Sequence, residues 1–174
     1  ILEPIQGESG IIVAPDGFLQ EVRKLCDEKG ILLIFDEIQA GLGRTGRLWA
    51  GEHWNTAPDI LCLAKGIAGG VPMGATLVRP DILAAISKGE HSSTFGGNPI
   101  SCAAGIAALT SITEDGLIEN SKKMGEIFRE GLEKLKEKHT MIRDIRGKGL
   151  MIGIEMKFEV KDILMGLIQE GVLM

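Results

Sequence analysis

The chain has 174 residues, of which 44% are hydrophobic and 25% charged, a composition typical of a globular protein rather than a disordered one. Its formal net charge of -5 gives no electrostatic reason to expect nucleic acid or an anionic membrane as a partner. No stretch approaches the roughly 18 apolar residues of a membrane span, and the first residues lack a secretory signal pattern, so we expect a cytoplasmic protein.

The first elements expected are a short strand, a loop and a helix. The strand covers residues 1–3 and is ended by the following proline, which favours an extended conformation before it. A glycine-bearing loop spans residues 6–10. Asp16 and Gly17 then open a helix in which apolar residues recur at helical spacing, with Gly30 placed as its C-terminal cap. This helix should cover one face of a sheet.

An apolar run over residues 31–35 ends abruptly in the carboxylate of Asp36. A continuous apolar run of this length predicts a strand buried on both faces, as in a parallel sheet. Such a strand delivers its last residue to the carboxyl edge of the sheet, where ligands of open α/β folds bind. A second short apolar strand, residues 60–64, ends in Lys65, and residues 74–78 predict a strand that turns back. Two strands thus end in opposite charges.

The next segment predicts a loop and two helices. Residues 91–99 are rich in hydroxyl and turn residues and lead into a helix over residues 100–111. Alanine, glycine and serine dominate this helix, so its neighbour, whether a helix, a cofactor loop or a second subunit, should pack closely against it. Residues 114–139 predict a longer amphipathic helix whose lysine and glutamate side chains form a solvated face.

Beyond residue 140 the pattern changes to short strands and one helix, expected at residues 142–145, 150–156 and 160–170, and then to a severed strand at Val172. We therefore expect an α/β chain with two parts. Residues 1–113 would be part of a large domain, and residues 114–174 a linking helix and the start of a small α+β domain. Because both ends lie in apolar segments and domain boundaries usually fall in polar linkers, we expect a piece of a longer protein.

Lys65 stands at the end of an apolar strand and is followed by Gly66, Gly69 and Gly70. Desolvation there would favour the neutral amine, which is how a lysine becomes a nucleophile toward carbonyl groups. A reactive lysine together with a buried aspartate indicates pyridoxal 5'-phosphate (PLP), whose aldehyde condenses with a lysine and whose ring nitrogen must stay protonated. Asp36 would be the partner of that ring nitrogen.

Other assignments remain open for the residues around Asp36. Gln39, shortly after it, could donate a hydrogen bond to the phenolic oxygen of PLP. Asp36 could instead have a structural role, as a helix N-cap or in an ion pair. An apolar strand followed by Asp-Glu is also typical of the magnesium-binding (Walker B) strand of nucleotide-hydrolysing proteins. That class requires a GxxxxGK[ST] loop, which this sequence lacks.

Two further patterns give weaker signals. Gly41, Gly43 and Gly46 satisfy the GxGxxG spacing of dinucleotide-binding loops. Several residues separate them from the preceding strand, however, so a loop that needs positive φ angles is the favoured explanation. The three cysteines of the chain are widely spaced and lack the pattern of a metal site, so we expect reduced thiols and no bound metal.

Several short motifs occur in a fixed order, at residues 3–8 (EPIQGE), 35–39 (FDEIQ), 43–46 (GRTG), 58–60 (PDI), 64–66 (AKG), 69–70 (GG), 94–99 (TFGGNP) and 146–150 (RGKGL). In this order they resemble the motif set of class III (ornithine/acetylornithine/4-aminobutyrate) PLP-dependent aminotransferases, and the resemblance covers essentially the whole chain. It implies fold type I, with a mostly parallel sheet in a large domain, a small C-terminal domain, and a homodimer with shared active sites.

The resemblance also implies roles for individual residues. It makes Lys65 the lysine that binds PLP covalently and moves the substrate proton, Asp36 the partner of the pyridine nitrogen, and Gln39 the contact to the ring hydroxyl. The implied reaction transfers an amino group from an ω-amino donor, most plausibly acetylornithine or a relative, to 2-oxoglutarate. Ornithine and 4-aminobutyrate remain alternative donors within the family.

Three more residues are implied to contact ligands. Thr94, with Ser93, would bind the cofactor phosphate of the neighbouring subunit, and Glu8 matches a glutamate that lies near the substrate, although a solvated loop glutamate is the alternative. A complete family member also has a Gly/Ser-rich phosphate loop, an aromatic residue stacked on the ring and a C-terminal substrate-binding arginine, none of which this chain carries. We therefore expect the chain alone to be inactive, or to be a non-catalytic fragment.

Overall fold

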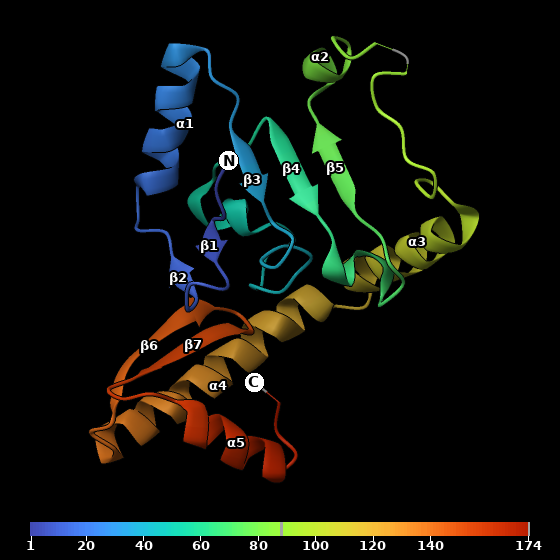
Figure 1. Ribbon diagram of the computed structural model, residues 1–174. Helices are drawn as coiled ribbons and strands as arrows, with labels where there is room; N and C mark the ends of the chain where they lie inside the picture. The colour runs from blue at the N-terminus through green and yellow to red at the C-terminus, as the bar shows by residue number, and fades with distance from the viewer. Residues whose placement is uncertain (88, 174) are drawn as a thin grey trace.

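The computed structural model describes residues 1–87 and 89–173. Its elements follow in the order β1 Ile5–Gln6, β2 Ile12–Val13, α1 Phe18–Lys29, β3 Ile34–Asp36, the 3₁₀ helix η1 Ala50–Trp54, β4 Ile60–Leu63, the 3₁₀ helix η2 Lys65–Ala68, β5 Ala75–Val78, α2 Pro80–Leu83, α3 Pro99–Glu114, α4 Leu117–Lys138, β6 Ile142–Lys148, β7 Met151–Met156 and α5 Lys161–Gln169. Figure 1 shows α1 beside the strands β3 to β5, and the β6–β7 hairpin next to α4 and α5. This mixture of helices and small sheets confirms the expected α/β class.

A three-stranded sheet in the order β3-β4-β5 organises the first half of the chain. β3 and β4 are parallel, with Asp36 opposite Cys62. β5 runs antiparallel to β4, which confirms the strand predicted to turn back at residues 74–78. The strand expected at residues 1–3 is reduced to a single bridge between Leu2 and Phe35. In that bridge the Leu2 amide donates to the Ile34 carbonyl at 3.0 Å and the Asp36 amide to the Leu2 carbonyl at 2.9 Å.

The prediction of a strand over residues 31–35 buried on both faces is wrong at its start. Ile31 and Leu32 are 57% and 47% exposed, whereas Leu33 and Phe35 are buried. The physical reason is the end of α1, because the Ile31 amide still donates to the Cys26 carbonyl at 2.9 Å and belongs to the helix cap. Regular pairing in the sheet therefore begins only at Ile34.

The core of the molecule is one cluster of buried apolar side chains under α1. Leu19 of α1 and Phe35 of β3 are completely buried, and Leu61 and Leu63 of β4 and Trp54 of η1 join them. Burying a leucine or phenylalanine side chain contributes about 1.5–3 kcal/mol, so these contacts hold α1 on the sheet. The predicted helix and its cap are confirmed, since Gly30 adopts a left-handed φ of 64°.

The second half confirms most of the predicted elements. α3, α4, β6, β7 and α5 lie where the periodicity places them. Asn98 caps α3, because its side chain accepts a hydrogen bond from the Ser101 amide, and a proline occupies the first turn. The severed strand expected at Val172 is wrong for residues 172 and 173, because the Val172 amide donates to the Leu167 carbonyl at 2.8 Å and closes α5; Met174 lies outside the described residues. The short elements β1, β2, η1 and α2 were not expected.

No helix within residues 1–87 and 89–173 combines the length and the apolar character that crossing a lipid bilayer would require. α4 is the longest described helix, and its lysine and glutamate side chains alternate with its apolar ones along the sequence.

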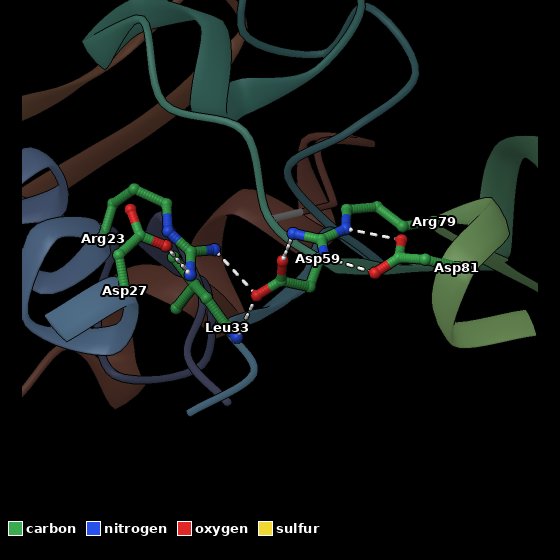
Figure 2. Close-up of polar contacts among 6 residues, drawn as sticks. All are labelled: Arg23, Asp27, Leu33, Asp59, Arg79 and Asp81. Carbon is green, nitrogen blue, oxygen red and sulfur yellow. Dashed lines mark hydrogen bonds and ion pairs between the residues drawn. The ribbon is translucent and has the colours of Figure 1, made fainter. Parts of the chain in front are cut away.

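A buried carboxylate joins three parts of the first half, as Figure 2 shows. Asp59, just before β4, accepts hydrogen bonds from the Leu33 amide at 2.7 Å and from Arg23 of α1 at 2.8 Å, and it also pairs with Arg79 at the end of β5. Burial opposes ionisation of Asp59, but the Leu33 amide and the two guanidinium groups outweigh it and hold its pKa below the usual range. The carboxylate is therefore charged and fully paired.

Replacing Asp59 with asparagine should lower the free energy of unfolding by about 3 kcal/mol, because it removes the buried charge that pairs with both Arg23 and Arg79 and leaves Arg23 only the exposed Asp27. Urea unfolding at neutral pH measures this loss. Since the pKa of Asp59 is lower in the folded than in the unfolded chain, its stabilisation is complete above the ordinary aspartate pKa of about 4 and disappears as the pH falls through the folded value.

The matched control is Asp81→Asn, which removes an exposed carboxylate that also pairs with Arg79. Its effect should be much smaller, because exposed ion pairs are screened by water. An equal loss in the two variants, or a difference between Asp59→Asn and the wild type that persists at acid pH, would contradict the role assigned to Asp59.

Candidate active site

Asp36 lies at the carboxyl end of β3 and is half-buried. One of its carboxylate oxygens, Oδ1, accepts a hydrogen bond from the Ile38 amide at 3.0 Å. No α-helix begins there, and Asp36 forms no ion pair with any residue that the structure describes, so neither structural alternative considered for it is found. The other carboxylate oxygen, Oδ2, accepts no hydrogen bond from these residues and is available to a ligand.

Lys65 follows β4, the parallel neighbour of β3, and begins η2. Its side chain is exposed, so the expected desolvation by the surrounding glycines is wrong. The reason is the turn of η2, which directs Ile67 and Ala68 into the core and leaves Lys65 outside. Its backbone has a left-handed φ of 48°, which costs a non-glycine residue about 1–2 kcal/mol. Strain of this kind is often found at functional sites.

Gln39 and Lys65 line the same cleft, which has a volume of about 540 Å³. Ile112 of α3 and Leu117 of α4 line it from one side, and Met151 of β7 closes another. The cleft therefore lies where the carboxyl edge of the sheet meets the second half of the chain. Its position agrees with the sequence-based expectation that ligands bind beyond the ends of parallel strands.

The loop that carries Glu8 packs directly against Gln39. A Cβ atom added to Gly7 would lie 1.4 Å from Oε1 of Gln39, so a larger residue there would displace the end of this side chain. The Gly7 amide also donates to the Glu3 carboxylate at 3.0 Å. Glu8 itself is exposed on this loop, next to Gly7. The structure thus brings the Glu8 loop, Gln39 and the Lys65 cleft together.

Arg146 of β6 holds the far side of the same loop. Its Nε donates to the Gly10 carbonyl at 2.8 Å, and its Nη1 pairs with Glu155 of β7 at 2.6 Å. Ile11, next to Gly10, has a left-handed φ of 56°, an outlier for a β-branched residue. A Cβ atom on Gly153 of β7 would lie 3.0 Å from Cβ of Ile11, so the hairpin packs tightly on the turn. Ile11 in turn lines the cleft.

Ser93 and Thr94 are exposed on the connection between α2 and α3, and neither lines the cleft. Oγ of Ser93 accepts a hydrogen bond from the Gly96 amide at 3.0 Å. The structure of this chain therefore does not bring these two residues to the cleft with Lys65.

Glu37 is a buried residue that the sequence analysis did not single out. It is 1% exposed and accepts hydrogen bonds from the amides of Ala50 at 2.6 Å and Gly51 at 2.9 Å. Burial raises its pKa, although these two amides counteract the shift. The signal that could have identified it is strand alternation, which directs Asp36 and Glu37 to opposite sides. Glu37 therefore anchors the loop that leads to η1 and does not reach the cleft.

The loop after Glu37 contains glycines, two of which adopt backbone conformations that favour glycine. Gly43 and Gly46 have φ angles of 83° and 82°, which confirms the expected positive φ for these two glycines. Gly41 does not have a positive φ; a Cβ atom there would instead lie 2.9 Å from the Glu37 carbonyl oxygen. A Cβ atom on Gly46 would also lie 2.8 Å from Cβ of Lys122 on α4, so the loop packs closely on that helix. In the described part of the chain no three histidine, cysteine, aspartate or glutamate side chains are grouped to hold a metal ion. The cysteines, Cys26, Cys62 and Cys102, are free thiols.

Comparison with known proteins gives a consistent result. The family model described as Aminotransferase class-III matches residues 1–174. An acetylornithine aminotransferase of Caldanaerobacter subterraneus subsp. tengcongensis is 49% identical over 174 residues, covering 99% of this chain and 44% of that protein. The chain thus spans less than half of this relative's length.

Two solved structures are similar along nearly the whole chain. The ornithine aminotransferase of Plasmodium yoelii has a TM-score of 0.94 at 41% identity, covering 99% of this chain and 47% of its own. An ornithine aminotransferase of Toxoplasma gondii, with partial occupancy of PLP at its active site, has a TM-score of 0.94 at 42% identity. The match covers 99% of this chain and 42% of that one. The fold of this chain is therefore shared with these enzymes.

Replacing Arg146 with glutamine should release the Gly10–Ile11 turn, because glutamine cannot reproduce both the hydrogen bond to Gly10 and the ion pair with Glu155. Hydrogen exchange of the Gly10 and Ile11 amides, which both donate to the Gly7 carbonyl, should become faster. Hydrogen bonds from a charged group contribute about 1.5–3 kcal/mol, so a loss near 1 kcal/mol is expected for this partly exposed one.

Arg143→Gln is the matched control, since Arg143 pairs with the same Glu155 at 2.8 Å but does not contact the turn. Exchange of the Gly10 and Ile11 amides should be unchanged in that variant. Equal acceleration in both variants would show that the hairpin as a whole, and not Arg146, holds the turn.

Proposed function

The chain belongs to the class-III aminotransferases, a family of PLP-dependent enzymes, and from this membership we propose that it forms part of an active site for amino-group transfer. The donor is an ω-amino compound resembling acetylornithine, and the acceptor is 2-oxoglutarate. The observation that carries the proposal is that Gln39 and Lys65 line one cleft. This cleft lies at the carboxyl edge of the parallel strands β3, which ends in Asp36, and β4, which precedes Lys65.

The family match also decides between the earlier alternatives. The predicted fold type I is confirmed by solved aminotransferases that superimpose on 99% of the chain. The nucleotide-hydrolysing alternative is overturned, because the class-III model covers all of residues 1–174. Asp36 and Glu37 are therefore not a magnesium-binding pair, in agreement with the separate environments of the two carboxylates.

Gln39 and Lys65 line the cleft, and Asp36 ends β3 at the same edge of the sheet without lining it; together these three residues suit PLP by their chemistry. The cofactor presents a pyridine nitrogen, a phenolic oxygen and an aldehyde, and the site offers a carboxylate with an available oxygen, an amide and an exposed amine. Asp36 would keep the ring nitrogen protonated, Gln39 would donate to the phenolic oxygen, and Lys65 would hold the aldehyde carbon. When bound, PLP supplies an electron sink for the substrate carbon that loses its proton.

Lys65 has the second role of moving the substrate proton. Lys65 is exposed and lines the cleft, where its amine would take the proton from the substrate carbon as a general base and return it as a general acid. A positioned group of this kind contributes about 10²- to 10⁴-fold to the rate. The backbone of Lys65 is left-handed, and the turn that carries it is anchored in the core by Ile67.

We assign Glu8 to substrate binding. We assign the loop residues Ser93 and Thr94 to binding the cofactor phosphate in the active site of a second subunit. Glu8 lies on the loop packed against Gln39, and a carboxylate there would contact a cationic group near the donor. Ser93 and Thr94 are remote from the cleft of their own chain, which is the arrangement required if they bind the cofactor phosphate in the partner's site. The functional unit is accordingly a cytoplasmic homodimer with shared sites.

We also propose that the 174-residue chain is inactive by itself. Residues 1–113 would form part of the cofactor-binding domain, and residues 114–174 the linking helix and the start of the small domain. The relatives are more than twice as long, so a complete site requires segments that this chain does not carry. The experiments on activity therefore use a full-length protein that contains this chain.

Borohydride reduction of the full-length protein incubated with PLP should attach the cofactor irreversibly to Lys65, as peptide mass spectrometry would reveal. The Lys65→Ala variant should lose the labelled peptide and at least about 10²-fold of the activity. Lys24→Ala, an exposed lysine on α1, should keep both. Labelling at another lysine, or none, would remove Lys65 from the proposed mechanism.

The Asp36→Asn variant should still be labelled at Lys65 but should lose about 10²-fold in kcat, since asparagine cannot hold the proton on the ring nitrogen. The pH dependence of the absorption spectrum of bound PLP should also differ between this variant and the wild type. Asp16→Asn, an exposed residue before α1, provides the control. Unchanged kcat and spectrum in Asp36→Asn would contradict its role.

The donor is tested by comparing kcat/KM for acetylornithine, ornithine and 4-aminobutyrate, each with 2-oxoglutarate. We expect acetylornithine to give the highest value, and Glu8→Gln to raise KM for the donor more than it lowers kcat. A preference for 4-aminobutyrate, or activity only with another acceptor, would overturn the assignment within the family.

A further inference from the structure

A second cavity, of about 270 Å³, is lined by an excess of cationic side chains. We propose that it binds a phosphate group, either as inorganic phosphate or as a phosphomonoester, independently of the catalytic cleft. Its cations come from the loop before η1, from α4 and from β6, and are Arg47, Lys122, Arg129 and Lys148; His53 of η1 adds an imidazole ring, and Glu126 is the one carboxylate among the lining residues. This concentration of positive charge is unexpected in a chain with a formal net charge of -5.

The cavity adjoins the catalytic cleft, with which it shares Ile152 as a lining residue, and closely packed backbone lies between the two. The Leu150 amide donates to the Arg44 carbonyl at 3.0 Å, and a Cβ atom on Gly149 would lie 2.4 Å from the carbonyl carbon of Thr45. Gln39 and Lys65 line the cleft on one side of this packed backbone, and neither lines the second cavity. An anion in the second cavity would therefore not contact the proposed catalytic lysine.

Several of the cationic side chains are held by contacts of their own. Nζ of Lys148 lies 5.4 Å from the ring centroid of Trp54, whose side chain is buried. Nη2 of Arg129 donates to the Gly147 carbonyl at 3.2 Å. Nε2 of His53 contacts both the carbonyl and the hydroxyl oxygen of Thr45, at 3.1 and 3.0 Å. The site is thus partly organised before any ligand binds.

The cations also act on one another, because they converge on one space. Burial lowers the pKa of His53, and the positive charges of Lys148 and Arg47 lower it further. In the described residues Arg47, Lys122 and Lys148 form no ion pair with a carboxylate. Like charges held together repel, and an anion placed between them would remove that repulsion.

The size and composition of the cavity favour a phosphate group over a larger ligand. Sites for whole drug-sized molecules usually have about 300–1,000 Å³, so this cavity has room for a phosphate group or a small phosphomonoester. Arginine side chains bind phosphate oxygens through paired N–H groups, and lysine adds a compact charge, so two arginines and two lysines match a dianionic oxyanion.

Isothermal titration calorimetry with sodium phosphate, at an ionic strength held constant with sodium chloride, tests the proposal on the 174-residue chain. Saturable binding of phosphate that chloride does not reproduce is expected. Lys148→Gln and Lys122→Gln should each weaken binding about tenfold, equivalent to about 1.4 kcal/mol. Circular dichroism verifies that each variant is folded, and titration with glycerol phosphate distinguishes a phosphomonoester site from one for inorganic phosphate.

Lys123→Gln is the matched control, because Lys123 is next to Lys122 on α4 and carries the same charge but does not line the cavity. Phosphate should also shift the NMR signals of the His53 ring and leave those of His91 and His139 unchanged. Thr94→Ala should retain phosphate binding, which separates this cavity from the proposed cofactor-phosphate contact. Heats equal to those of chloride, equal weakening by Lys123→Gln, or an unmoved His53 signal would overturn the proposal.

Discussion

The buried carboxylate of Asp59 is the interaction on which the first half of the structure depends. It joins α1 through Arg23, the start of β3 through the Leu33 amide, and the end of β5 through Arg79. Taking a carboxylate out of water is costly, and here three donors compensate for it at once. Asp36 is the last residue of β3, and Lys65 follows β4. Because Asp59 holds these two parallel strands in place, it also fixes the spacing of the two residues proposed to hold the cofactor.

A second constraint joins the two halves of the chain across the cleft. Arg146 donates to the Gly10 carbonyl, and the hairpin packs on Ile11, whose backbone is left-handed. Lys65, on the opposite side of the cleft, is also left-handed. A strained residue persists only where its surroundings determine its conformation, and here both residues lie between rigid elements. The cleft is therefore shaped by packing from both halves rather than by one flexible loop.

The adjacent acids Asp36 and Glu37 lie in different environments. Asp36 keeps an available oxygen at the strand end, whereas Glu37 is buried and binds the amides that begin η1. A metal site would need both carboxylates to converge, and strand alternation separates them. Their separation agrees with the family match. The cationic cavity lies elsewhere, beyond the packed backbone of Arg44 and Gly149, and involves neither acid.

The sequence by itself determined the features that depend on neighbouring residues. Helix α1 and its Gly30 cap, the amphipathic α4 and the positive φ of Gly43 could be predicted because each follows from local periodicity or backbone sterics. The ordered motifs indicated the family and the fold through their resemblance to the class-III motif set. Only the tertiary structure decided the exposure of Lys65 and Ile31, the burial of Glu37 and the central place of Asp59. The burial of Glu37 and the place of Asp59 depend on partners distant in the chain, which no local pattern predicts. The exposure of Ile31 and of Lys65 depends on how the end of α1 and the turn of η2 are placed on the core, which the apolar pattern alone does not give.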